Sequence, residues 1–133
     1  MGLYTLKGLQ NFATKMARQI TTAPYALGLK GEIGAGKTTF AKAFIHHFDK
    51  DTDITSPTFP IVQYYNHGQI AHYDLYRIKH VDEFYTLDIL EDLYTKICLI
   101  EWPELLNDVL DPPIPTMHIS IKDDDKREIQ FYS

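Results

Sequence analysis

Hydrophobic residues recur with helical spacing in several stretches of the chain, and these stretches predict its helices. Apolar positions repeat every three or four residues over residues 6–20, 39–48 and 81–94, and a shorter stretch of the same kind covers residues 105–110. Because an α-helix completes a turn every 3.6 residues, this spacing gathers the apolar side chains on one face. We therefore predict amphipathic helices there, with residues 81–94 forming either one helix or two short ones.

Short apolar runs bounded by turn residues predict the strands. Residues 25–29 and 97–100 are apolar enough to form buried strands. Residues 61–73 contain two strand-like segments around an Asn-His-Gly turn, and residues 114–132 contain two more around a charged turn. These last two regions are expected to form antiparallel hairpins that extend a central sheet.

The segment between the first buried strand and the next helix carries a phosphate-binding motif. Gly31, Gly36, Lys37 and Thr38 satisfy the spacing G-x-x-x-x-G-K-[ST]. Strand, loop and helix follow one another in the order that the motif requires. The glycines allow the loop to aim backbone N–H groups at a phosphate, and the helix N-terminus adds partial positive charge. The loop is therefore predicted to bind the phosphates of a nucleotide.

Each residue of this loop has an expected role. The backbone of Gly34, Ala35 and Gly36 would surround a phosphate, and Lys37 would reach the β- and γ-phosphates as a point charge. Thr38 offers a hydroxyl to Mg²⁺, and the N–H of Thr39 would bind the α-phosphate. These assignments predict a site for ATP and Mg²⁺.

Carboxylates follow two of the apolar strands. Asp74 comes after residues 69–73, and Glu101 after residues 97–100. Asp74 taken alone would be a helix cap or a turn residue. Parallel strands, however, bring their carboxyl ends to one edge of a sheet, where ligands bind, and acids there hold Mg²⁺ or orient an attacking water. We predict Lys37, Asp74 and Glu101 as catalytic residues, and Thr38 and Glu101 as metal ligands.

Together these features predict an α/β fold. The expected architecture is a three-layer P-loop NTPase fold with a mainly parallel central sheet and antiparallel hairpin additions, formed as a single domain by residues 1–133. Between the phosphate loop's helix and the Asp74 strand lies Ser56-Pro57-Thr58-Phe59-Pro60, a constrained loop that we consider a candidate switch. Within it, Thr58 is the candidate sensor of the γ-phosphate.

Composition restricts the partners and the compartment. The chain has 133 residues, a net charge of −5 and a pI of about 5.6, so no basic surface indicates direct nucleic-acid binding. The single cysteine, Cys98, lies in an apolar run and fits a reducing compartment. The sequence shows no secretory leader and no apolar stretch of membrane-spanning length. We expect a soluble, cytoplasmic protein with no membrane contact.

Four sequence blocks resemble the TsaE family of tRNA N6-threonylcarbamoyladenosine synthesis. They are residues 31–40, 56–59, 72–77 (His-Tyr-Asp-Leu-Tyr-Arg) and 99–104 (Leu-Ile-Glu-Trp-Pro-Glu). The resemblance implies a Mg²⁺-dependent P-loop ATPase that binds ATP and ADP and acts with the TsaB–TsaD heterodimer. The tRNA, which is modified at position 37, would be contacted only indirectly, through these partners.

The resemblance also implies individual residue roles. The family's magnesium threonine corresponds to Thr38, and its metal-binding or water-orienting acids correspond to Asp74 and Glu101. Nucleotide-contacting positions of the family correspond to Trp102, Glu104 and Arg127. Two departures from the family pattern, around residues 85–86 and at residue 105, affect a partner-facing surface and leave the nucleotide site intact.

Two other functions remain open at this point. A small-molecule or nucleotide kinase would share the loop, but such enzymes use several lid arginines, and this chain has only Arg18, Arg77 and Arg127. A nucleotide-dependent switch, in which hydrolysis is incidental and the bound nucleotide sets the affinity for a partner, would suit the same residues.

Overall fold

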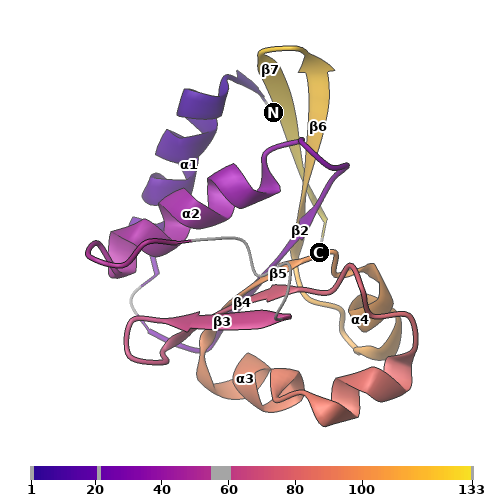
Figure 1. Ribbon diagram of the computed structural model, residues 1–133. Coiled ribbons are helices and arrows are strands. Elements are labelled where there is room, and N and C mark those ends of the chain that lie inside the picture. The colour runs from indigo at the N-terminus through magenta and orange to yellow at the C-terminus, as the bar shows by residue number, and fades with distance from the viewer. Residues whose placement is uncertain (1, 21, 55–60, 133) are drawn as a thin grey trace.

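A computed structural model of the chain describes residues 2–20, 22–54 and 61–132. The described residues form one seven-stranded sheet with helices on both of its faces (Figure 1). The strands are β1 (Leu3–Tyr4), β2 (Tyr25–Lys30), β3 (Val62–Tyr65), β4 (Ile70–Asp74), β5 (Ile97–Glu101), β6 (Thr116–Asp123) and β7 (Lys126–Tyr132). The helices are α1 (Leu6–Arg18), α2 (Lys37–Phe48), the 3₁₀ helix η1 (Val81–Thr86), α3 (Ile89–Thr95) and α4 (Glu104–Val109).

The sheet has the strand order β1-β7-β6-β2-β5-β4-β3. The four central strands β6, β2, β5 and β4 run parallel to one another. Both predicted hairpins are present, β3–β4 and β6–β7, and each adds an antiparallel pair. The expected parallel arrangement therefore holds for the centre of the sheet, while the sheet as a whole is mixed.

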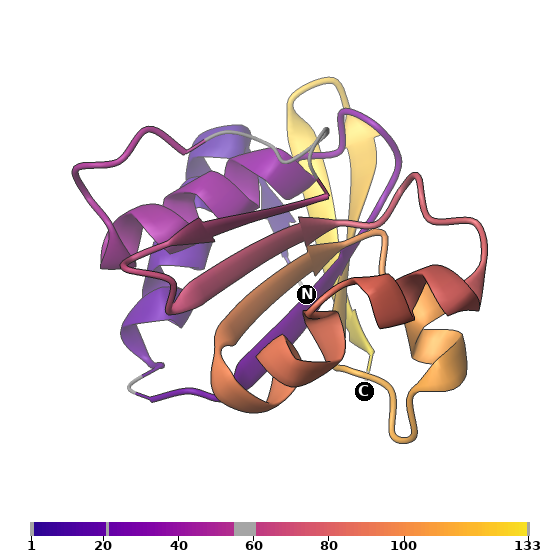
Figure 2. The same cartoon turned by 60° about the horizontal axis from the view of Figure 1, so that its bottom comes forward.

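Each face of the sheet has its own hydrophobic core (Figures 1 and 2). Helices α1 and α2 pack on one face through Leu9, Ala13, Phe40 and Phe44, which meet Leu27, Leu29 and Leu99 of the strands. Residues Phe84, Ile89 and Leu106 cover the other face, where they meet Tyr73 and Ile100. Because strand side chains alternate between faces, the residues that share a face with Leu99 include Asp74 and Glu101. Both acids therefore lie on the side of the sheet that α2 covers.

A polar cluster around the buried carboxylate of Asp92 joins α3 to the β3–β4 hairpin. The carboxylate of Asp92, which is buried, accepts hydrogen bonds from the hydroxyls of Tyr73 at 2.5 Å and Tyr64 at 2.6 Å. Burial and the Asp92 hydrogen bond raise the pKa of Tyr64 to about 12, and the same causes raise the pKa of Tyr73. The cluster thus favours neutral tyrosines and fixes α3 against the sheet.

Residues 81–94 follow the two-helix alternative of the prediction and form η1 and α3, with Leu87 and Asp88 between them. Other boundaries differ from the expectation. Helix α2 begins at Lys37, two residues before the start of its apolar pattern, so the lysine and threonines of the motif occupy its first turn. The two-residue strand β1 was not predicted, and it pairs with β7. The candidate switch at 56–60 lies outside the described residues, and no helix within them is long and apolar enough to cross a membrane.

Candidate active site

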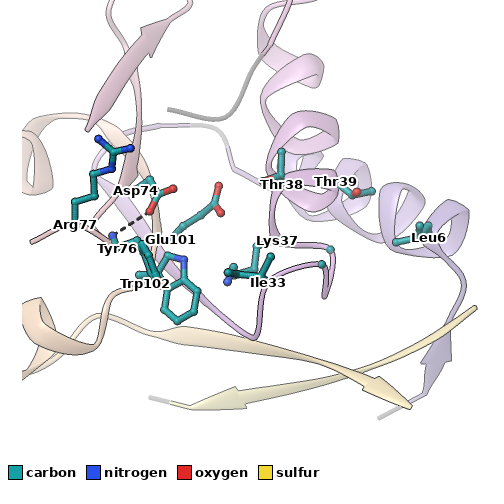
Figure 3. A pocket seen from close by; sticks show the side chains of 12 residues that line it. Leu6, Ile33, Lys37, Thr38, Thr39, Asp74, Tyr76, Arg77, Glu101 and Trp102 are labelled. Atoms are coloured by element: carbon teal, nitrogen blue, oxygen red, sulfur yellow. Dashed lines mark hydrogen bonds between the residues drawn. The ribbon is translucent and has the colours of Figure 1, made fainter. Parts of the chain in front are cut away.

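A cavity of about 440 Å³ opens between the β2–α2 loop and the carboxyl ends of β4 and β5. Figure 3 shows Asp74 and Glu101 on one side of it and Lys37 and Thr38 on the other, with Leu6 at the end beyond Thr39. Its lining consists of Leu6, Ile33, Gly34, Gly36, Lys37, Thr38, Thr39, Asp74, Tyr76, Arg77, Glu101 and Trp102. The fold thus brings the loop residues and both strand-end acids to one pocket.

The loop conformation requires glycine at Gly31 and Gly36. Gly36 has φ = 118°, and a Cβ atom there would lie 2.7 Å from a methyl carbon of Leu9. Gly31 has φ = 155°, and its Cβ would lie 2.5 Å from the carbonyl oxygen of Ile119. L-residues rarely adopt these values of φ, and neither position has room for a side chain. The glycines of the motif therefore serve both the turn and the packing of the loop on its neighbours.

The start of α2 presents backbone donors to the pocket. The first hydrogen bond of this helix runs from the N–H of Phe40 to the carbonyl of Gly36, at 2.9 Å. The N–H groups of Lys37, Thr38 and Thr39 precede it, so they have no partner within the helix. With the helix dipole they give this end of the pocket a partial positive charge suited to an anion.

Lys37 lies inside the pocket with its ammonium group already held. Nζ donates a hydrogen bond to the carbonyl of Gly31 and lies 3.7 Å from the ring centroid of Trp102. The residue is only 6% exposed, and this burial lowers its pKa, while the carboxylates of Glu101 and Asp74 oppose the shift. Trp102 has φ = 59°, an uncommon left-handed conformation that keeps its ring beside the loop.

The two acids are neighbours across β4 and β5. Asp74 pairs with Glu101 in the register of these strands. One oxygen of Asp74 accepts the N–H of Tyr76 at 3.0 Å, and burial raises the pKa of this carboxyl. Glu101 is almost fully buried at 3% exposure. The structure thus places a half-buried and a buried carboxyl group at the same edge of the pocket.

Glu101 has a buried histidine partner that sequence reasoning missed. Nε2 of His72 lies 2.7 Å from Oε2 of Glu101, and His72 is fully buried. A carboxylate accepts this bond, so Nε2 carries the hydrogen. Among the described residues, Nδ1 of His72 is a buried nitrogen without a hydrogen-bond partner. The available signal was strand periodicity, because His72 stands two residues before Asp74 and therefore points to the same face.

The side chains of the pocket are of the kind that a magnesium ion bound together with a nucleotide would use. No group of three or more His, Cys, Asp or Glu side chains able to hold a metal occurs in the described part of the chain. Mg²⁺ usually keeps several waters and takes one or two carboxylates together with substrate phosphates. The pocket lining offers oxygen atoms of this kind in the hydroxyl of Thr38 and the carboxyls of Asp74 and Glu101.

Three residues with predicted nucleotide contacts do not line the pocket. Ala35 is fully buried, and its carbonyl accepts a hydrogen bond from Arg127, which reaches the loop from β7. Glu104 begins α4 and lines a separate cavity with Lys30 and Asn107. The roles of these residues toward a nucleotide stay predictions. Conversely, Leu6, Ile33, Tyr76 and Arg77 line the pocket without having been predicted there.

Fold and pocket together define a class of protein: a mixed α/β protein in which a glycine-rich strand–loop–helix segment faces two acid-terminated strands. A family model described as threonylcarbamoyl adenosine biosynthesis protein TsaE matches residues 3–129. The chain belongs to the TsaE family.

Individual relatives agree with this assignment. A tRNA threonylcarbamoyladenosine biosynthesis protein TsaE from Rickettsia typhi is 41% identical over 124 residues, which cover 91% of this chain and 85% of the relative. The protein of the same name from Bacillus subtilis is 40% identical over 110 residues, covering 79% and 67%. The crystal structure of Bacillus subtilis YdiB is similar with a TM-score of 0.72 at 31% identity, covering 96% of this chain and 80% of that one.

Proposed function

We propose that this protein is a Mg²⁺-dependent P-loop ATPase that serves tRNA threonylcarbamoyladenosine biosynthesis. The observation that carries the ATPase part is the single pocket that gathers Lys37, Thr38, Asp74 and Glu101 from three separate segments. Membership of the TsaE family and the names of the relatives support the pathway. The proposal also includes the TsaB–TsaD heterodimer as the partner.

Phosphate binding begins at the loop and the first turn of α2. Backbone N–H groups there have no helical partner and act as fixed donors. Lys37 exchanges the carbonyl of Gly31 for a phosphate oxygen, because a charged acceptor forms the stronger hydrogen bond. This exchange also withdraws the ammonium group from the ring of Trp102.

Hydrolysis requires a positioned water opposite the phosphate. Glu101 is the residue we assign to it, since its carboxylate is held by His72 and its position at the end of β5 faces the loop. The hydroxyl of Thr38 and the carboxyl of Glu101 would hold the ion, with the carboxyl of Asp74 beside them. Mg²⁺ bound with the nucleotide would neutralise the charge that develops on the transferred phosphoryl group.

Hydrolysis by the isolated protein is expected to be slow. An arginine supplied by a partner can raise the rate of phosphoryl transfer by about 10³ to 10⁵. We therefore propose that TsaB–TsaD changes the rate of hydrolysis and that its affinity for this protein depends on the bound nucleotide.

The test measures release of inorganic phosphate from Mg-ATP by the purified protein. Lys37→Ala and Thr38→Ala are expected to abolish hydrolysis, while Lys42→Ala, which removes an exposed lysine of the same helix, should leave it unchanged. Glu101→Ala should lower hydrolysis more than nucleotide affinity. Retained turnover in folded Lys37→Ala or Thr38→Ala protein would refute the ATPase assignment.

The partner is tested separately. Reconstituted TsaB–TsaD and tRNA are combined with the wild-type protein, and association is measured with ATP, with ADP and without nucleotide. If association is the same in all three conditions and the pair leaves hydrolysis unchanged, the partner assignment fails while the ATPase assignment stands.

A further inference from the structure

Within the described residues, the guanidinium group of Arg127 donates its hydrogen bonds to backbone carbonyls. Nε donates to the carbonyl of Ala35 at 2.8 Å, and Nη2 donates to that of Gly34 at 3.4 Å. Nη1 donates to carbonyls of the β6–β7 turn, those of Asp124 at 3.2 Å, Lys126 at 3.3 Å and Asp123 at 3.5 Å. Arg127 is only 6% exposed. One side chain therefore ties the phosphate loop to the C-terminal hairpin.

We propose that Arg127 is a positioning residue that aims the N–H group of Gly36 at the bound phosphate by holding the carbonyl of Ala35 behind it. The inference deepens the proposed function and rests on it, because it concerns how the same loop binds a nucleotide.

Peptide geometry links the held carbonyl of Ala35 to the pocket. In a planar trans peptide, the C=O and N–H groups point in opposite directions. The carbonyl of Ala35 shares a peptide with the N–H of Gly36, whereas the N–H of Ala35 already donates to the carbonyl of Glu32 at 3.1 Å. Since Arg127 draws the carbonyl of Ala35 toward β7, the N–H of Gly36 points away from β7. Gly36 itself lines the pocket.

The peptide between Ala35 and Gly36 needs such a restraint. The preceding peptide is held by the bond from the N–H of Ala35 to the carbonyl of Glu32, whereas the bond from Arg127 holds the carbonyl of the Ala35–Gly36 peptide. Glycine adopts positive and negative φ with similar ease. A rotated peptide would turn a carbonyl oxygen toward the phosphate and repel it. The contacts from Arg127 favour the orientation that presents donors.

The β6–β7 hairpin lies beside the loop. In both Figures 1 and 2 the segment that joins β2 to α2 passes beside this hairpin. The carbonyl of Ile119 on β6 leaves no room for a side chain at Gly31. Arg127 on β7 binds the carbonyl of Ala35, four residues further along the loop. The hairpin therefore shapes the loop at two points.

The charge of Arg127 also favours an anion in the pocket. Within the described residues, ion pairs occur between His72 and Glu101 and between Lys122 and Glu128, and none involves Arg127. A buried cation without a carboxylate partner is costly, and an anion in the adjacent pocket lowers that cost. Because all three nitrogens of the guanidinium donate to carbonyls, Arg127 acts through the loop and not by touching the phosphate.

The test compares the affinity of Arg127 variants for Mg-ADP and for a Mg-bound non-hydrolysable ATP analogue, measured by isothermal titration calorimetry. Arg127→Lys keeps the charge but has no fork to hold two carbonyls, and we expect about tenfold weaker binding of both nucleotides. Arg127→Gln should lose at least as much. Lys122→Gln removes a charge from the same hairpin away from the loop and should bind as the wild type does.

Several outcomes would overturn the inference. Wild-type affinity in Arg127→Lys means that charge alone matters, and a loss confined to the ATP analogue means direct contact with the γ-phosphate. If the wild type binds nucleotide and both Arg127 variants bind equally well, the positioning role fails while the proposed function stands. If the wild type binds no nucleotide, the proposed function fails.

Backbone amide spectra test the loop without nucleotide. In ¹⁵N-labelled Arg127→Lys, the amide signal of Gly36 should shift or broaden, while those of β4 and β5 stay as in the wild type. An unchanged Gly36 signal overturns the positioning role. The β4 and β5 signals show in the same spectrum that the variant is folded.

Discussion

Replacing His72 with leucine should destabilise the protein by removing the donor to a buried carboxylate. Glu101 is 3% exposed and accepts a 2.7 Å hydrogen bond from His72, which is fully buried. A hydrogen bond to a charged group contributes about 1.5–3 kcal/mol, and the variant would leave an almost fully buried carboxylate without this donor. We therefore expect His72→Leu to lose about 1.5–3 kcal/mol of unfolding free energy. This is a substantial fraction of the ~5–15 kcal/mol typical of a domain.

Urea denaturation at pH 7 measures the loss of unfolding free energy. The urea concentration at the transition midpoint should fall, while the slope of unfolding free energy against urea concentration stays unchanged. His46→Leu, at an exposed position on α2, is the matched control and should shift the midpoint little. The double variant His72→Leu/Glu101→Leu removes both partners, and such replacements are often nearly neutral. It should therefore recover most of the stability that His72→Leu loses.

The same variants separate a stabilising role from a positioning role in catalysis. If His72 holds Glu101 for hydrolysis, His72→Gln, which keeps an N–H donor, should retain more activity than His72→Leu, and kcat should fall more than KM rises. A stability loss below about 0.5 kcal/mol in His72→Leu, within the range of an ordinary surface substitution, would refute the reasoning.

Three further predictions concern the loop, the second acid and the tyrosine cluster. Gly36→Ala places a Cβ 2.7 Å from Leu9 at φ = 118°, so we expect a loss of about 1–3 kcal/mol in thermal unfolding and weaker ATP binding, whereas wild-type behaviour would contradict the strain argument. Burial raises the pKa of Asp74, so the neutral form is favoured in the folded state and stability is lost as the pH rises through the folded pKa. Asp74→Asn should therefore raise the melting temperature of the nucleotide-free protein at pH 7 while hydrolysis falls, and an unchanged or lower melting temperature would contradict this. The folded pKa of Tyr64, about 12, exceeds the ordinary value of 10, so its contribution to stability is full below pH 10 and is lost between pH 10 and 12 as the unfolded tyrosine ionises. Tyr64→Phe should flatten the decline of the urea midpoint over that range, and an equally steep decline in the variant would contradict the assignment.

Local sequence patterns determined much of this molecule. The loop glycines, the lysine and threonine that follow them, and the acids at the ends of β4 and β5 are all features of short segments. Each depends on backbone geometry or on strand alternation over a few residues, so it can be recognised without knowing the fold. The two hairpins and the central buried strands were predicted for the same reason.

Tertiary structure alone decided which distant residues complete the pocket. Strand order places β2 between β5 and β6, and this brings the loop against the β6–β7 hairpin and against the ends of β4 and β5. Arg127 reaches a carbonyl 92 residues away, and His72 reaches a carboxylate 29 residues away. Leu6 enters the lining because α1 packs beside α2. Such contacts depend on strand order, register and helix packing, which are properties of the whole hydrophobic core, and no short segment of sequence specifies them.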